Sequence, residues 1–238
     1  MIWKRPEHSA IVGCLAALDA DLLAECGFYF GGGTRIVLEL SEYRLSRDVD
    51  FLCSDPAGYS KLRARARRDG AGALFREGAL LQGKPSEVRA DQYGIRFAVR
   101  ADQPVGDIKF EFIREGRIEL LPSVRPDWSP VQCLSIEDCF AEKLLANSDR
   151  WADRHVCSRD LLDLSVLRAV SGPIPPGALQ RAEKAYGSGI REDLRKALGQ
   201  FRDLSGFAAG CFTRLSLTDT AVVERGLDLL REDLLEIG

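Results

Sequence analysis

A glycine-rich turn that leads into an alternating strand constrains the fold of this chain more than any other feature. Three consecutive glycines occupy positions 31–33 and are followed by Thr34. The apolar spacing of residues 35–40 predicts a short helix that opens directly on this turn. Further on, Asp48 and Asp50 flank a valine in a segment with strand-like alternation. Because successive side chains of a strand point to opposite faces, both carboxylates are expected on one face.

The glycine turn is a candidate phosphate-binding loop. Gly32 and Gly33 allow a phosphate to come close to the backbone, and N–H groups at the start of the following helix would point toward it. Thr34 could add a hydroxyl donor. The alternative is a tight turn that needs glycine only for its backbone dihedral angles.

Asp48 and Asp50 form a candidate metal site. Two carboxylates a few ångströms apart repel each other unless a cation lies between them. Mg²⁺ prefers hard oxygen ligands, and a strand holds such ligands on a rigid backbone. The alternative is an exposed strand edge with two solvated aspartates.

A third carboxylate lies in a segment with the same alternation. Residues 107–114 alternate between apolar and charged side chains and predict a strand with Lys109 and Glu111 on its charged face. If the two strands pair, Glu111 joins Asp48 and Asp50 in a three-carboxylate site. It would then bind a second metal ion or act as the base that activates a nucleophile. The alternative is a half-exposed strand whose charged face lies in water.

The order of the expected elements predicts an α+β half at residues 1–130 and an all-helical half at residues 131–238. In the first half, helices are expected at residues 9–25 and 59–68, and strands at residues 28–30, 48–53, 74–81, 94–100 and 107–114. In the second half, helices are expected at residues 135–147, 158–170, 176–186, 190–201 and 218–237.

Charged residues on two of the expected helices form a further candidate group. Lys143 and Arg150 are seven residues apart and share a helical face, and Asp160 and Asp163 share another at a spacing of three. In one interpretation Lys143 binds a triphosphate, while Asp160 orients it or pairs with a basic residue. In the other interpretation, these are ordinary surfaces held by salt bridges.

The net charge limits how the chain could bind nucleic acid. Its formal value is −3 for 238 residues, so no global positive field indicates such a partner. Any RNA contact requires a local patch, and the helix expected at residues 59–68 offers one. This patch consists of Lys61, Arg63, Arg65, Arg67 and Arg68. The alternative is a solvated helix.

The cysteines and the apolar segments indicate in which cellular compartment the protein is expected. The chain has seven cysteines, an odd number, and none of them forms a C-x-x-C pair, so a reducing cytoplasm is expected. With only His8 and His155, a structural zinc site is not expected. No apolar run approaches the length of a membrane span.

Taken together, the motifs resemble those of the AbiEii/AbiGii toxin-type nucleotidyltransferases, a branch of the DNA polymerase β-like superfamily. The resemblance extends over about residues 28–167. Its motifs, in chain order, are Gly32-Gly33-Thr34, Ser46-Arg47-Asp48-Val49-Asp50-Phe51, Ile108-Lys109-Phe110-Glu111, Glu142-Lys143-Leu144 and Arg159-Asp160-Leu161-Leu162-Asp163-Leu164.

The resemblance implies a fold and a site. The fold would be a nucleotidyltransferase-like mixed sheet with flanking helices, followed by a helical domain that closes the nucleotide cleft. Asp48 and Asp50 would bind Mg²⁺, with Glu111 completing a two-metal site. Lys143 and the segment at residues 159–160, which comprises Arg159 and Asp160, would line the triphosphate.

The resemblance also implies an activity: Mg²⁺-dependent transfer of a nucleotide from an NTP to an acceptor hydroxyl. Some members of the family add nucleotides to tRNA, so RNA is the expected acceptor. Members act as toxins of toxin–antitoxin pairs, here of type IV, so a cognate antitoxin is an expected partner. The alternatives are a small-molecule or protein acceptor, and a module that binds a nucleotide or a partner without catalysis.

Three features depart from the family pattern. The loop from Thr34 to Asp48 is about one residue longer than usual. Arg35 stands where a small residue usually follows the glycine–hydroxyl pair, and it would either reach a phosphate or block it. Glu111 stands where the superfamily usually has aspartate, which lengthens the reach of the third carboxylate by one methylene.

Overall fold

The computed structural model describes residues 2–79, 83, 85–101 and 105–236. The chain forms two compact units, and each is described by itself. The first contains residues 1–35 and 46–135, and the second contains residues 36–45 and 136–238. The boundary thus lies at Ser135, a few residues beyond the expected position 130, and the ten-residue segment 36–45 belongs to the helical unit.

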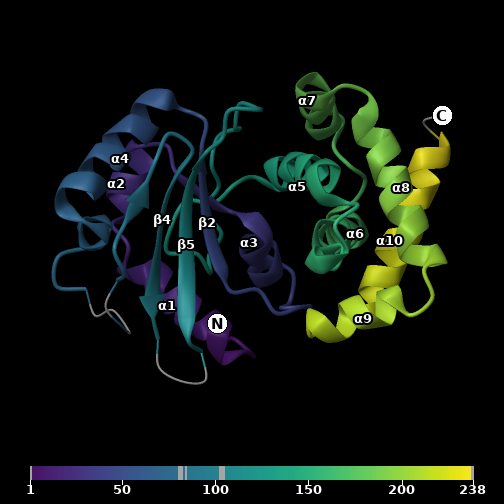
Figure 1. Cartoon of the computed structure of the whole chain (residues 1–238), viewed down its shortest axis with the longest axis horizontal. Coiled ribbons are helices and arrows are strands. Elements are labelled where there is room, and N and C mark those ends of the chain that lie inside the picture. Colours follow the sequence, from purple (N-terminus) through teal and green to yellow (C-terminus); the bar gives the residue numbers. More distant parts are fainter. Residues whose placement is uncertain (1, 80–82, 84, 102–104, 237–238) are drawn as a thin grey trace. The chain divides into compact units, whose positions relative to one another are not determined.

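A five-stranded mixed sheet organises the first unit (Figure 1). The strand order is β1-β2-β5-β4-β3, in which β2 and β5 are parallel and the other neighbours are antiparallel. The strands are β1 (Tyr29–Gly31), β2 (Asp48–Cys53), β3 (Arg89–Ala90), β4 (Gly94–Arg100) and β5 (Asp107–Arg114). The mixed α+β architecture expected from the sequence is confirmed.

Aromatic side chains fill the apolar face of this sheet. Phe51 stacks on Phe112 with ring centroids 4.9 Å apart. Phe28 contacts Phe112 at 5.7 Å and Tyr59 at 6.2 Å. Tyr59 belongs to α4 (Pro56–Asp69), so this helix covers the apolar face, and Figure 1 shows α2 on the same side. Burial of these rings leaves the opposite face of the sheet to the charged residues.

The helix expected at residues 9–25 is two helices. α1 (Pro6–Ala17) ends before Leu18, and α2 (Ala20–Glu25) begins after Asp19. The Asp19 carboxylate accepts a hydrogen bond from the Leu22 N–H at 3.0 Å, which caps the second helix. The apolar spacing continues through this break, so periodicity alone did not reveal it.

The strand expected at residues 74–81 is wrong over the part that the structure describes. Ala71–Leu74 forms a 3₁₀ helix, η1, and Phe75 makes only an isolated bridge to Leu18. Residues 80 and 81 of that prediction lie outside the described residues.

The chain passes from the first unit to the second within α3 (Gly32–Glu39). This helix begins directly after β1, three residues earlier than expected. Gly32, its first residue, has a φ of +66°, a left-handed conformation that favours glycine.

The second unit is helical. Its elements are α5 (Ile136–Arg150), η2 (Arg154–Val156), α6 (Arg159–Ser171), α7 (Pro176–Tyr186), α8 (Gly189–Asp203), α9 (Phe207–Arg214) and α10 (Thr220–Glu236). α10 packs closely on α6 at Gly226, where an added Cβ would lie 1.8 Å from the Ser165 carbonyl oxygen. The five helices expected here are present, and α9 was not expected.

Segment 36–45 joins this unit through backbone hydrogen bonds. The Leu45 N–H donates to the Leu215 carbonyl at 2.9 Å, and the Thr218 N–H donates to the Tyr43 carbonyl at 2.8 Å. The boundary expected near residue 130 left this segment in the first half of the chain. Its hydrogen-bond partners in the helical unit lie about 170 positions later, so no local pattern indicated them.

Candidate functional site

The two aspartates of β2 lie on the charged face of the sheet. Asp48 and Asp50 are partly exposed, whereas Val49 and Phe51 between and after them are buried. The expected alternation is therefore present, and it leaves both carboxylates on the face opposite the aromatic core.

The Asp50 carboxylate lies against the glycine turn. In the antiparallel pair of β1 and β2, Asp50 is directly opposite Gly31. A Cβ added to Gly32 would lie 2.2 Å from Asp50 Oδ2 and 2.9 Å from Asp50 Cβ. Glycine is therefore required at position 32 for two reasons, its positive φ and the space that Asp50 occupies.

Thr34 holds the start of β2. Its side chain is buried, and its hydroxyl donates to the Asp48 carbonyl and exchanges a hydrogen bond with Ser46 Oγ at 2.7 Å. The Thr34 hydroxyl thus fixes the position of Asp48. Gly32 and Gly33 are partly exposed, so the start of α3 remains accessible to a ligand.

Arg35 neither reaches into solvent nor covers the turn from outside. It is 1% exposed, and its Nε donates to the Leu134 carbonyl at 3.2 Å. Leu134 in turn donates its N–H to the Phe30 carbonyl of β1. The large side chain at this position is therefore buried inside the first unit, where its hydrogen bond stabilises the position of Leu134 beside β1.

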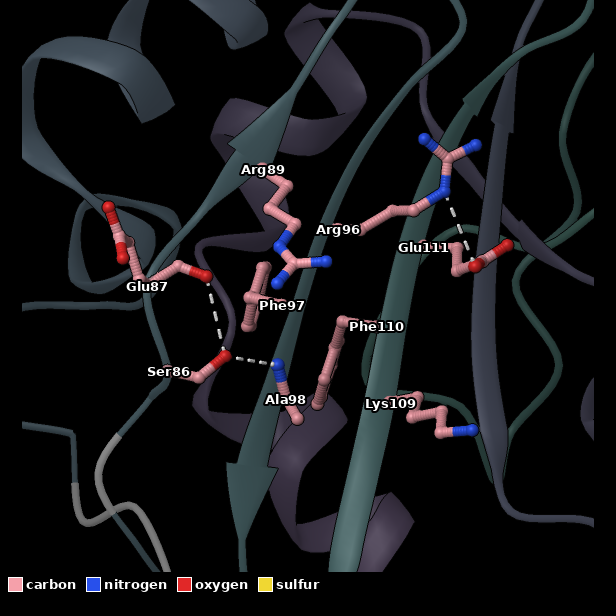
Figure 2. A pocket seen from close by; sticks show the side chains of 9 residues that line it. All are labelled: Ser86, Glu87, Arg89, Arg96, Phe97, Ala98, Lys109, Phe110 and Glu111. Carbon is pink, nitrogen blue, oxygen red and sulfur yellow. Dashed lines mark hydrogen bonds and ion pairs between the residues drawn. The ribbon is translucent and has the colours of Figure 1, made fainter.

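Glu111 lies beside Asp50, because β5 pairs with β2 in parallel and the two residues are direct register partners. Glu111 Oε1 is 3.4 Å from Arg96 Nε on β4, and both side chains are about 40% exposed (Figure 2). Within the part of the chain that the structure describes, no three His, Cys, Asp or Glu side chains gather closely enough to hold a metal ion.

The donor set nevertheless fits Mg²⁺. Asp48 and Asp50 supply two carboxylates on one face of a strand, next to the accessible N-terminus of α3. Mg²⁺ usually binds to one or two protein carboxylates and completes its coordination with water and substrate phosphates. Two carboxylates beside the glycine turn meet that requirement without a third protein ligand.

Lys143 and Asp160 lie in the second unit, in a buried ionic network. Lys143 Nζ is 2.8 Å from Asp160 Oδ1 and 2.6 Å from Asp163 Oδ2. Arg150 contacts both oxygens of Asp160 at 2.5 and 2.9 Å, and Arg44 contacts both oxygens of Asp163 at 2.7 and 2.8 Å. Buried charges of this kind are stable only when they are paired, as these are.

The network controls the pKa of its carboxyl groups. Burial alone would raise the pKa of Asp160, but Lys143 and Arg150 outweigh it and hold that pKa well below its usual range. Burial likewise opposes ionisation of Asp163, and Arg44 and Lys143 lower its pKa. Both carboxyl groups are therefore ionised at neutral pH.

Arg44 and Tyr43 are members of this network that the sequence did not single out, and the sequence placed Asp163 on one face with Asp160 without a role of its own. The Tyr43 hydroxyl donates to Asp163 Oδ1 at 2.5 Å. The spacing of three between Asp160 and Asp163 was the available signal, since it places both on one helical face. Arg159, at the first position of α6, is partly exposed and forms no ion pair with any other described residue.

The expected basic patch on α4 is largely engaged within the first unit. Lys61 pairs with Glu25 and Arg68 with Asp69. The other three donate to backbone carbonyls, namely Arg63 to Asp91, Arg65 to Ala73 and Arg67 to Ala90. Each of the five cations therefore has a partner within the chain.

The fold of this chain is that of nucleotidyltransferases. The crystal structure of JHP933 from Helicobacter pylori matches it with a TM-score of 0.59 at 16% identity, covering 99% of this chain and 96% of that one. A second Helicobacter pylori protein, described as a candidate nucleotidyltransferase, matches with a TM-score of 0.52 at 14% identity, covering 97% and 96%. No curated protein sequence matches significantly.

The sequence itself specifies the family. Residues 14–218 match the family described as "Nucleotidyl transferase AbiEii toxin, Type IV TA system". The chain belongs to this family and is a nucleotidyltransferase, as the motifs of the sequence predicted. None of the helices in the described residues has the length and apolarity needed to cross a membrane.

Proposed function

We propose that this chain transfers a nucleotide from an NTP to a hydroxyl of an RNA acceptor, as the toxin of a type IV toxin–antitoxin system. The observation that carries the proposal is the contact between Asp50 and Gly32 at the start of α3. It brings the Asp50 carboxylate, which we propose holds the metal ion, to the N-terminus of a helix, where phosphates bind well. The family description supports the biological role and an antitoxin partner.

The residues of the first unit have distinct roles in this proposal. Backbone N–H groups at Gly32 and Gly33 bind the phosphates of the NTP. Asp48 and Asp50 would hold Mg²⁺, which when bound would neutralise phosphate charge. Thr34 maintains the position of Asp48 through its hydrogen bond to the Asp48 carbonyl.

Glu111 is the proposed base. It accepts the proton of the acceptor hydroxyl while the oxygen attacks the α-phosphorus and the bond to the bridging oxygen breaks, which releases pyrophosphate. Its position next to Asp50 in the parallel pair supports this role. Its carboxylate must exchange its contact with Arg96 for one with the hydroxyl.

The residues of the second unit have two different roles in this proposal: some stabilise a helix, and one binds the nucleotide. Lys143 and Asp160 are buried in mutual ion pairs, which favours a role in holding the first turn of α6. Arg159, partly exposed at the start of that helix, is the proposed contact to the nucleotide. Loss of Lys143 would then act through the position of Arg159.

Nucleotide transfer tests the proposal directly. The protein is incubated with each labelled NTP, Mg²⁺ and total tRNA, and label on RNA is measured. We expect the Asp50→Asn variant to lose about 1,000-fold or more in rate, because a metal-binding carboxylate is removed from the transition state. The matched control Asp69→Asn, at the exposed end of α4, should retain full activity.

Two results would reject this function. Wild-type protein that binds NTP without transferring label to RNA would indicate a non-catalytic module, or an acceptor of another class. Transfer that persists in Asp50→Asn would exclude the proposed metal site. Thermal unfolding of the variant establishes that it is folded.

A further inference from the structure

One row of side chains crosses the charged face of the sheet from edge to edge. Asp50 is the register partner of Glu111 on β5, and Glu111 is the partner of Arg96 on β4. Arg96 is in turn the partner of Arg89 on β3. The row thus runs from the carboxylates of the proposed active site to two arginines at the opposite edge.

A pocket of about 330 Å³ lies over the arginine end of this row (Figure 2). Arg89, Arg96 and Lys109 line it from three neighbouring strands, and Glu111 borders it toward Asp50. The small side chain of Ala98, which is the register partner of Lys109, leaves the space between β4 and β5 open.

Three cations and two carboxylates, Glu87 and Glu111, line this pocket, so its positive charge exceeds its negative charge. Arg89 and Arg96 lie directly opposite each other, an arrangement in which like charges are destabilising. Arg96 is compensated by Asp91 and Glu111, each at 3.4 Å. Arg89 and Lys109 are exposed, and neither forms an ion pair with another residue that the structure describes. A bound anion would relieve this repulsion.

The position of the pocket indicates which substrate carries that anion. The phosphate-binding turn adjoins β1, at one edge of the sheet, and the pocket extends from β5 to β3, at the other edge. The carboxylates of β2 lie between them. Neighbouring strands are about 4.8 Å apart, so Arg89 lies roughly 14 Å along the sheet from Asp50. An anion held there belongs to the acceptor, on the far side of the carboxylates from the NTP.

We propose that Arg89, Arg96 and Lys109 form a subsite for the backbone phosphates of the acceptor strand, adjacent to its reacting hydroxyl. This inference rests on the proposed function, because the acceptor side is defined by the position of the NTP. Lys109, the register partner of Asp48, contacts the phosphate nearest the reaction, and Arg89 contacts one further along the strand.

The test is RNA binding by a double variant, Arg89→Gln with Lys109→Gln. Affinity for a fluorescein-labelled single-stranded 12-nucleotide RNA is measured by anisotropy over a series of KCl concentrations, without NTP. We expect the Kd to rise about 10-fold or more, and the slope of log Kd against log salt to fall by about 1.4, since each lost phosphate contact removes about 0.7.

A matched double variant on the other side of the sheet is the control. Lys61→Gln with Arg68→Gln removes the same charge from α4, where both cations are already paired. Its RNA affinity should equal that of the wild type. An equal loss in both double variants would overturn the subsite, because the effect would then follow net charge alone.

Two further measurements separate this inference from the proposed function. Binding of a non-hydrolysable NTP should be unchanged in Arg89→Gln with Lys109→Gln, and a loss there would assign the pocket to the NTP and overturn the inference. If transfer to RNA occurs but the double variant keeps the wild-type KM for RNA, the subsite is wrong and the function stands. If RNA binding depends on these residues but no nucleotide is ever transferred, the function is wrong and the anion subsite stands.

Discussion

At the scale of single residues, the space beside Gly32 controls the site. Its backbone has a φ of +66°, and the Asp50 carboxylate occupies the volume that a side chain would need. The two constraints act on different properties of the protein. The positive φ affects stability, whereas the contact with Asp50 affects the position of the carboxylate that we propose binds Mg²⁺.

Gly32→Ala should therefore impair activity more than stability. The left-handed conformation costs about 1–2 kcal/mol for a residue with a Cβ. The new methyl group also displaces the Asp50 side chain. The rate of nucleotide transfer should therefore fall about 100-fold or more, because a group displaced by about 1 Å at the reaction site can reduce the rate that much. Urea unfolding and the transfer assay measure the two effects.

Gly206→Ala is the matched control. Gly206 has a φ of +74°, and no atom lies within 4 Å of the Cβ that would be added. The substitution should cost similar stability and leave the transfer rate unchanged. Equal activity in Gly32→Ala and wild-type protein would show that the Asp50 contact has no role.

At the scale of elements, the start of α6 depends on its buried ion pairs. Two non-glycine residues in the left-handed region precede the helix, Cys157 with a φ of +55° and Ser158 with a φ of +48°. Such residues persist only where the surrounding structure holds them. The ion pairs of Asp160 with Lys143 and Arg150 supply that restraint in the first turn of the helix.

Asp163→Asn should destabilise the protein at neutral pH, and by a smaller amount in acid. The variant leaves Arg44 and Lys143 buried without their full partners, which costs about 3–5 kcal/mol. The pKa of Asp163 is lowered in the folded state, so its stabilisation is complete above the unfolded pKa of about 3.9 and is lost as pH falls further. Below about pH 4, the gap between variant and wild type should narrow by about 1.4 kcal/mol per pH unit.

Urea unfolding from pH 7 to pH 3 measures this gap. Asp203→Asn is the control, because Asp203 forms an exposed pair with Arg202, and exposed pairs contribute little. A gap between Asp163→Asn and wild type that stays constant down to pH 3 would contradict the assigned ionisation of Asp163.

At the scale of the whole molecule, the helical unit is discontinuous in sequence. Segment 36–45 contributes Tyr43 and Arg44 to the network around Asp163, and its backbone bonds to Leu215 and Thr218. The helices after residue 135 therefore lack part of their own core. The segment also begins inside α3, whose first residues belong to the glycine turn.

A fragment of residues 136–238 should consequently fold poorly by itself. Without Arg44, Asp163 loses a two-point ion pair, and the fragment should unfold without a cooperative transition. A synthetic peptide of residues 36–45 should restore a cooperative transition in circular dichroism, because it returns Tyr43 and Arg44. The same peptide with Arg44→Ala should not. Cooperative unfolding of the fragment alone would contradict the role of this segment.

The sequence by itself determined the local geometry of the site. Alternation along one strand places Asp48 and Asp50 on the same face, and a glycine turn before a helix follows from dihedral preferences of adjacent residues. These are properties of neighbouring positions, so they can be read directly from the chain. The family and the mixed α+β fold followed from the order of such motifs.

Only the tertiary structure decided which distant residues meet. The parallel pairing of β2 with β5 sets Glu111 beside Asp50, and the register of two more strands brings Arg96 and Arg89 into the same row. Arg44 reaches Asp163 across 119 positions. Strand register and long-range ion pairs depend on how whole elements pack, which no local pattern encodes. The glycine turn and its aspartates were therefore evident in the sequence, whereas the cationic end of the row was not.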